Sequence, residues 1–191
     1  MKAKIAILVV VLVQTAILIS VCGAQDFKLD VKTLGGLSLP APESIAGKKY
    51  LGLSDKPEFS LGQLKFDVIF LQIFSMYCPV CQKDASSVNQ LFELVEADPK
   101  LKGRVRFLGI GTGNTPYEVE VFQKKFNIKF PLIPDDDFRI QKIASSDLRT
   151  PTFVIAKIKP GNQVEILKIK VGEIGDSQAF FNSMSKMLGS K

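Results

Sequence analysis

Residues 67–81 read Asp-Val-Ile-Phe-Leu-Gln-Ile-Phe-Ser-Met-Tyr-Cys-Pro-Val-Cys and join a nearly continuous apolar run to two cysteines. Such a run is typical of a central strand in a parallel sheet, buried on both faces. After Cys81, apolar residues recur at helical spacing until Asp98 and Pro99 interrupt the pattern. They are Ala85, Val88, Leu91, Phe92 and Val95. The stretch therefore predicts a buried strand that runs into a helix, with both cysteines at the start of that helix.

The spacing of Cys78 and Cys81 suits redox chemistry. Residues three apart in the first turn of a helix lie on one face, within reach of a disulfide bond. Cys78 falls near the N-cap, where unpaired N–H groups and the helix dipole favour a thiolate. We therefore expect Cys78 to be the nucleophile and Cys81 the less exposed resolving thiol. Pro79 fits because no intrahelical N–H bond is lost at the first helical position.

Two other interpretations of the pair stay open. A structural disulfide would close a very short loop, which contributes ~1.9 kcal/mol in the chain-entropy model and connects no distant segments. Half of a zinc site would need two more cysteine or histidine ligands. The chain has three cysteines and no histidine, so such a site would require a second copy. We favour the redox interpretation and expect no metal and no cofactor.

Composition limits the remaining functions. A chain of 191 residues suits one domain with one core. The net charge of +6 comes without a basic run, so nucleic-acid binding is not expected. The absence of histidine excludes histidine-based acid/base chemistry, Ser/His and Cys/His dyads, and most catalytic zinc sites.

The rest of the chain alternates strand and helix patterns. We expect strands at 105–110, 130–133, 152–158 and 164–171, a helix after the capping box Thr115-Pro116-Tyr117-Glu118, a short helix at 138–144, and a last helix capped by Asp176 or Ser177. The last two strands are joined by residues 159–162 and should form an antiparallel hairpin. Upstream, residues 27–31 and 50–53 suggest another hairpin. The order predicts an α/β sandwich: a mixed central sheet flanked by helices.

The N-terminus has the pattern of an export signal. Lys2 and Lys4 precede the apolar residues 5–21, and Cys22-Gly23-Ala24 offers small residues for cleavage. Cleavage after Ala24, retention as a membrane anchor and lipidation at Cys22 all remain open. Each outcome places the protein in the periplasm, either soluble or tethered to the membrane. We divide the chain into a signal or anchor (1–24), a lead-in (25–49) and one domain (50–191).

The motifs together resemble the thioredoxin superfamily, and within it the TlpA/ResA-like redoxins, exported bacterial thiol:disulfide oxidoreductases. The resemblance covers about residues 50 to 188. The motifs that carry it are the apolar strand ending in Phe74, Cys78-Pro79-Val80-Cys81, the extra strand and helix from Phe130 to Ala144, Thr150-Pro151-Thr152-Phe153-Val154-Ile155, and Lys170-Val171-Gly172-Glu173-Ile174. The resemblance implies a thioredoxin-like sandwich with an extra strand and helix before a cis-proline at Pro151.

The resemblance also implies a function and a site. Cys78 and Cys81 would be catalytic, and Tyr77, Pro79, Thr150 and Pro151 would contact substrate. The substrates would be protein thiols or disulfides, and a membrane thiol-redox protein would be the partner. We favour a reductase, serving thiols of apocytochrome c. The alternatives are a non-catalytic binding protein or lipoprotein on the same fold and a peroxiredoxin-like antioxidant.

The chain departs from the family pattern at two residues near the cysteines. Tyr77 stands where the family usually has tryptophan. Gln72 occupies the place of a buried aspartate that relays the proton of the resolving cysteine in thioredoxins. Solvent or another carboxylate, such as Asp84, would then have to relay the proton of Cys81.

Overall fold

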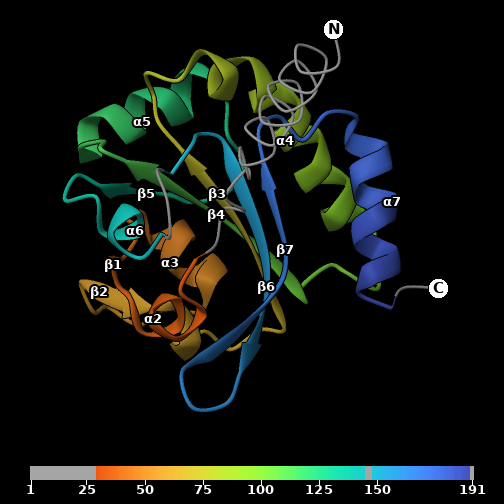
Figure 1. Ribbon diagram of the computed structural model, residues 1–191, viewed down its shortest axis with the longest axis horizontal. Helices are drawn as coiled ribbons and strands as arrows, with labels where there is room; N and C mark the ends of the chain where they lie inside the picture. The colour runs from red at the N-terminus through yellow and green to blue at the C-terminus, as the bar shows by residue number, and fades with distance from the viewer. Residues whose placement is uncertain (1–28, 145–147, 190–191) are drawn as a thin grey trace, which may run out of the picture.

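A five-stranded mixed sheet forms the centre of the molecule (Figure 1). The structure, a computed structural model, describes residues 29–144 and 148–189. From one edge to the other the strands are β5 (Leu132–Asp135), β4 (Val105–Thr112), β3 (Val68–Phe74), β6 (Thr152–Lys159) and β7 (Gln163–Val171). β4 is parallel to β3 and β5, whereas β6 is antiparallel to β3 and β7. The predicted α/β sandwich with a mixed sheet is confirmed.

Helices cover both faces of this sheet. The buried hydrophobic residues of three helices, α4 (Pro79–Ala97), α5 (Pro116–Lys125) and α7 (Ser177–Met187), belong to one cluster. A second cluster contains the buried hydrophobic residues of α2 (Val31–Gly36), β1 (Ser38–Pro40), α3 (Ile45–Leu51), β2 (Glu58–Ser60), the 3-10 turn η1 (Leu61–Gln63) and α6 (Arg139–Lys142). In Figure 1 the elements α2, α3, β1 and β2 lie together, on the side of the sheet away from α4 and α7. The sheet therefore separates two cores.

The alternation of side chains along β3 explains its unbroken apolar sequence. All seven of its residues are buried. Val68, Phe70 and Phe74 pack in the cluster beneath α4, whereas Ile69, Leu71 and Ile73 pack in the opposite cluster. A strand with two covered faces needs apolar residues at consecutive positions, as predicted.

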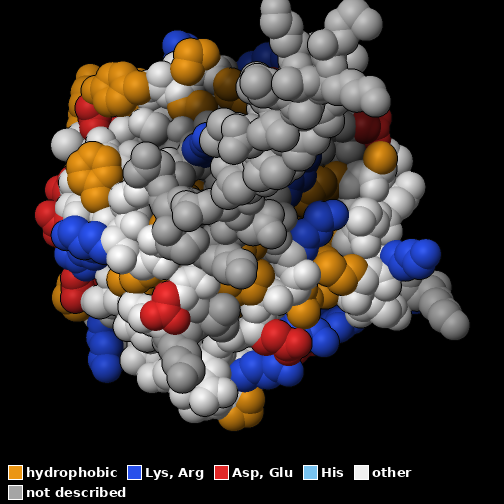
Figure 2. Space-filling view, in the orientation of Figure 1, with side chains coloured by type: hydrophobic (Ala, Val, Ile, Leu, Met, Phe, Trp, Pro, Cys, Tyr) orange, Lys and Arg blue, Asp and Glu red, His pale blue; other side chains and the backbone are white. Residues whose placement is uncertain are grey.

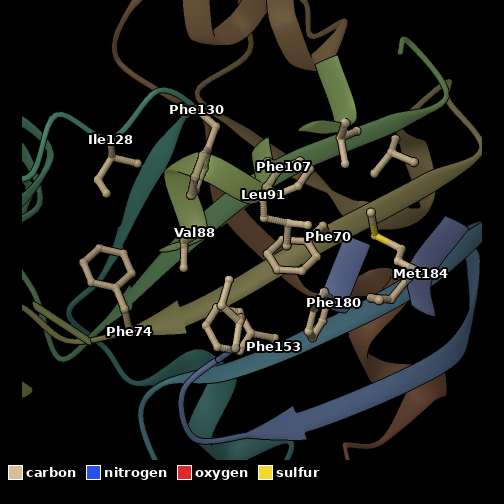
Figure 3. Packing of buried hydrophobic residues seen from close by; sticks show 14 of the residues in the cluster. Phe70, Phe74, Val88, Leu91, Phe107, Ile128, Phe130, Phe153, Phe180 and Met184 are labelled. Atoms are coloured by element: carbon tan, nitrogen blue, oxygen red, sulfur yellow. The ribbon is translucent and has the colours of Figure 1, made fainter. Parts of the chain in front are cut away.

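Aromatic rings fill the core beneath α4. Phe70 stacks on Phe107 with ring centroids 4.4 Å apart. The ring centroids of Phe153 and Phe180 lie 5.6 and 6.1 Å from that of Phe70. Figure 3 shows these rings together between β3 and α7. Aromatic pairs of this kind contribute about 0.5–1.5 kcal/mol each beyond their buried area. The helix that carries the cysteines thus rests on a densely packed support.

The inserted strand and helix are confirmed, with shifted bounds. β5 begins at Leu132 instead of 130, directly after Pro131, which has no N–H to donate to a strand. The short helix α6 is also shorter than the predicted 138–144. The Asp135 carboxylate accepts its first backbone N–H groups, from Arg139 at 2.7 Å and from Ile140 at 3.2 Å.

The predicted hairpin of residues 27–31 and 50–53 is wrong. Residues 50 and 51 end the helix α3, and Leu29 makes only an isolated bridge. The Ser44 side chain caps the start of α3, and Gly52 ends it at a φ of 66°, which glycine adopts without strain. These two signals specify a helix. The strand pair of this region is instead β1 with β2, in antiparallel register.

The predicted targeting segment, residues 1–24, lies outside the described residues. Within 29–144 and 148–189, no helix is both long enough and apolar enough to cross a membrane.

Candidate active site

A four-residue turn connects β3 to the cysteine pair. The N–H of Cys78 donates to the carbonyl oxygen of Ser75 at 3.1 Å, so residues 75–78 close on themselves. Cys78 is the N-cap of α4, and Pro79 is the first helical residue. The strand, turn and helix are arranged as the sequence predicted.

The sulfur of Cys78 has two polar neighbours. It accepts a hydrogen bond from the N–H of Cys81 at 3.1 Å and lies 3.3 Å from the carbonyl oxygen of Thr150, to which the thiol can donate. Both cysteines are free thiols; Cys78 is half-buried and Cys81 is completely buried. The Cys78 sulfur thus caps the start of a 19-residue helix, where the Cys81 N–H and the positive end of the helix dipole face it.

The environment of Cys81 differs, because this thiol has no contact with solvent. Burial, followed by the hydrogen bond with Cys78, raises the pKa of the Cys81 thiol to about 12. A hydrogen bond with the Ser75 backbone lowers this pKa, but by less. Cys81 therefore keeps its proton at neutral pH.

Thr150 and Pro151 reach the cysteines from the start of β6. The peptide bond between them is cis, which confirms the sequence prediction. The carbonyl oxygen of Pro151 accepts from the N–H of Gly172, and the hydroxyl of Thr152 donates to the carbonyl of Arg149 at 2.6 Å. These bonds fix the peptide that faces Cys78.

Tyr77 is bound to α5. The residue is 67% exposed and its hydroxyl donates to the carboxylate of Glu118. This hydrogen bond raises the pKa of Tyr77 and lowers the pKa of Glu118. Tyr117 and Phe138 are also exposed, and Figure 2 shows hydrophobic side chains gathered at the upper left of the molecule, where Figure 1 places α5.

Gln72 lies on the face of the sheet that α4 covers. Its side chain is an amide, which cannot accept a proton as the carboxylate of an aspartate does. It is fully buried, and by alternation along β3 it shares the face of Phe70 and Phe74, in whose cluster Cys81 packs. Neither atom of its amide has a hydrogen-bond partner among the described residues. Asp84 is buried too, and its carboxylate accepts from the N–H of Ile174 at 2.9 Å. Burial raises the pKa of Asp84.

Two polar residues that the sequence analysis did not identify hold the turn before Cys78. Asn114, fully buried after β4, accepts from the N–H of Met76, and Gln82 of α4 donates to the Met76 carbonyl. Both distances are 2.8 Å. Asn114 stands between Gly113 and a helix cap, where asparagine is ordinary, so no local signal distinguishes it. Within the described ranges, no three His, Cys, Asp or Glu side chains are grouped as metal ligands.

Several solved structures share the fold of this chain. No family model matches the chain. StoA from Bacillus subtilis has the same fold, with a TM-score of 0.54 and 17% identity over 76% of this chain and 94% of StoA. A secreted Mycobacterium tuberculosis disulfide oxidoreductase gives a TM-score of 0.51 and 18% identity over 68% of this chain and 88% of its own. The chain therefore shares its fold with StoA and with this disulfide oxidoreductase.

Sequence comparison narrows the resemblance to one branch. The chain is 23% identical over 100 residues to the thiol-disulfide oxidoreductase ResA of Geobacillus kaustophilus, covering 52% of this chain and 55% of ResA. The predicted similarity to ResA-like redoxins is thereby confirmed. The chain spans about half the length of the curated relatives it matches.

Proposed function

We propose that this chain exchanges disulfides with protein substrates through Cys78 and Cys81. The observation that carries the proposal is the asymmetry of the pair. The half-buried Cys78 sulfur accepts an N–H bond at the start of α4, whereas the Cys81 thiol is fully buried and keeps its proton. The relatives, which are named thiol-disulfide oxidoreductases, support the same activity.

In the first step the Cys78 thiolate attacks one sulfur of a substrate disulfide. A bond forms between Cys78 and that sulfur, the substrate S–S bond breaks, and the other substrate sulfur leaves as a thiolate. The Thr150 carbonyl borders the Cys78 sulfur, and an extended substrate segment would pass here, in contact with Pro79, Pro151 and Tyr77.

In the second step Cys81 resolves the mixed disulfide. In the free protein, Cys78 raises the pKa of Cys81 through a hydrogen bond and through charge. Both effects end once Cys78 is bonded to substrate, so the Cys81 proton passes to solvent more easily. The Cys81 thiolate then attacks the Cys78 sulfur, the intramolecular disulfide forms, and the second substrate sulfur leaves as a thiolate. Two electrons have passed from the cysteine pair to the substrate.

We propose the reducing direction and a site outside the cytoplasm. The export pattern at the N-terminus supports the location, and the structural neighbour from Mycobacterium tuberculosis is itself described as secreted. The resemblance to ResA-like proteins supports the direction. The proposed substrates are protein disulfides, including those of apocytochrome c, and a membrane thiol protein would return two electrons to the oxidised pair.

Equilibration with glutathione buffers tests both the activity and its direction. We expect the pair to titrate as a two-electron couple with a potential near that of thioredoxin, about −270 mV, and to catalyse reduction of insulin by dithiothreitol. A potential near −120 mV would indicate an oxidant. Absence of catalysis, with a Cys78→Ser variant no slower than the wild type, would contradict the proposed activity.

A further inference from the structure

The side chain of Asn114 makes three hydrogen bonds beside the active-site turn. Its Oδ1 accepts from the N–H of Met76 at 2.8 Å. Its Nδ2 donates to the hydroxyl of Ser75 at 3.4 Å and to the carbonyl oxygen of Gly113 at 3.2 Å. Asn114 has no exposed surface and lies 38 positions from Met76 in the sequence. A buried amide with all these partners is specific to one arrangement of the turn.

Gln82 binds the backbone carbonyl group of Met76. Its Nε2 donates to the carbonyl oxygen of Met76 at 2.8 Å. The N–H and the C=O of Met76 are therefore both bound by side chains from other elements, Asn114 after β4 and Gln82 on α4. The conformation of the turn is thus set by residues outside it.

The position of the nucleophile depends on this turn. Met76 is two residues before Cys78, whose N–H closes the turn on Ser75. The Cys78 sulfur has its neighbours, the Cys81 N–H and the Thr150 carbonyl, at 3.1 and 3.3 Å. Hydrogen bonds weaken steeply as the angle at the donor hydrogen falls below about 120°, so a rotation at Met76 would weaken the bond between the Cys81 N–H and the Cys78 sulfur.

The backbone at Gly111 leaves room for the Asn114 side chain. A Cβ atom added at Gly111 would lie 3.2 Å from both the Cβ and the Oδ1 of Asn114, and 2.8 Å from a methyl group of Val119. The bare backbone at Gly111 therefore lets the amide approach Met76.

We propose that Asn114 is a positioning residue for disulfide exchange, acting through Met76 to keep the Cys78 sulfur on the Cys81 N–H. Gln82 assists from the opposite side of the same residue. The proposal rests on the proposed function, because it assigns a role in the reactivity of Cys78.

The test compares Asn114→Ala with Asn89→Ala. Asn89 also makes three hydrogen bonds, to Phe126, Asn127 and Lys129, but none of these residues belongs to the active-site turn. Both variants should lose thermal stability. Only Asn114→Ala should slow alkylation of Cys78 at pH 7, by about threefold to tenfold, because the Cys78 sulfur is no longer held on the Cys81 N–H.

Gln82→Met gives a second, independent arm. It removes the bond to the Met76 carbonyl at similar side-chain volume, and we expect a smaller decrease in the same rate. This arm also serves if Asn114→Ala does not fold. Wild-type alkylation rates of Cys78 in the folded variants, whatever their stability, would overturn the positioning role. Failure of the proposed function would be seen differently, as a wild-type protein whose Cys78 reacts with iodoacetamide but catalyses no disulfide exchange.

Discussion

The thiol of Cys78 lies 3.3 Å from the carbonyl oxygen of Thr150, a residue 72 positions further along the chain. The antiparallel pairing of β3 with β6 brings the two segments together, since Ile73 pairs with Thr152 at the end of the ladder. Long-range strand pairing thus places a backbone acceptor beside the proposed nucleophile.

The two cysteines should differ in reactivity. In the folded, reduced protein at pH 7, iodoacetamide should modify Cys78 first, because its sulfur is partly accessible and rests on the Cys81 N–H. Cys81 should react only in denaturant, since it is fully buried. Mass spectrometry of the digested protein measures both rates. Equal rates in the folded protein, or faster modification of Cys81, would contradict the assigned roles.

The stability of the reduced protein should fall at alkaline pH. An unfolded cysteine has a pKa of about 8.5, whereas burial raises the pKa of Cys81 to about 12 in the folded state. The raised pKa contributes stability that is complete below the unfolded value and is lost as pH rises toward the folded value. Between them the free energy of unfolding should fall by on the order of 1.4 kcal/mol per pH unit.

Urea unfolding at pH 8, 9 and 10 measures this slope, with Cys81→Ala as the comparison. The alanine variant keeps every other titrating group, so the difference between the two proteins reports on the Cys81 thiol together with its interaction with Cys78. Parallel pH dependences would mean that Cys81 ionises as easily in the folded protein as in the unfolded one.

Replacing Gln72 by methionine should stabilise the protein. The buried amide of Gln72 has no partner among the described residues, and such a group costs about 1–3 kcal/mol. A methionine of similar volume should raise the free energy of unfolding by about 1 kcal/mol. Gln123→Met is the control, because the Gln123 amide donates to the Phe130 carbonyl at 3.1 Å, and its loss should destabilise. Destabilisation by Gln72→Met would show that this amide does have a partner.

Tyr77→Phe should change the titration of Glu118. The Tyr77 hydroxyl is the largest cause of the lowered pKa of Glu118, ahead of the Thr115 N–H. Without the hydroxyl this pKa should rise toward its ordinary value while staying below it, because the Thr115 bond remains. NMR titration of the side-chain carboxyl carbon measures the change. Tyr117→Phe, which alters the neighbouring exposed tyrosine, should leave the pKa unchanged; the idea fails if both variants behave alike.

Local sequence carried enough information to predict the central elements. β3 is buried on both faces and α4 has a regular apolar stripe, so their patterns are unambiguous. The capping box at Thr115 and the cap at Asp176 marked two further helices. The cysteine pair could be placed because it stands at the junction of two such elements.

The N-terminal region could not be predicted in the same way. β1 and β2 are three residues each, too short for a period of two to be recognised, and they pair across an intervening helix. Leu34, Leu39 and Leu51 are completely buried, but glycine, proline and polar residues beside them interrupt any regular apolar period in the sequence. The role of Asn114 could not be predicted either, because only folding brings it beside Met76, which is 38 positions away in the sequence.

Trapping of the mixed disulfide tests the proposed chemistry most directly. Purified Cys81→Ser and Cys78→Ser proteins, each also carrying Cys22→Ser, would be incubated with oxidised glutathione at neutral pH and their intact masses measured. We expect Cys81→Ser to gain one glutathione, because Cys78 attacks and nothing resolves the product, and Cys78→Ser to stay unmodified because its thiol is buried. Modification of Cys78→Ser with an inert Cys81→Ser would contradict Cys78 as the nucleophile, and two inert variants would contradict disulfide exchange by this pair.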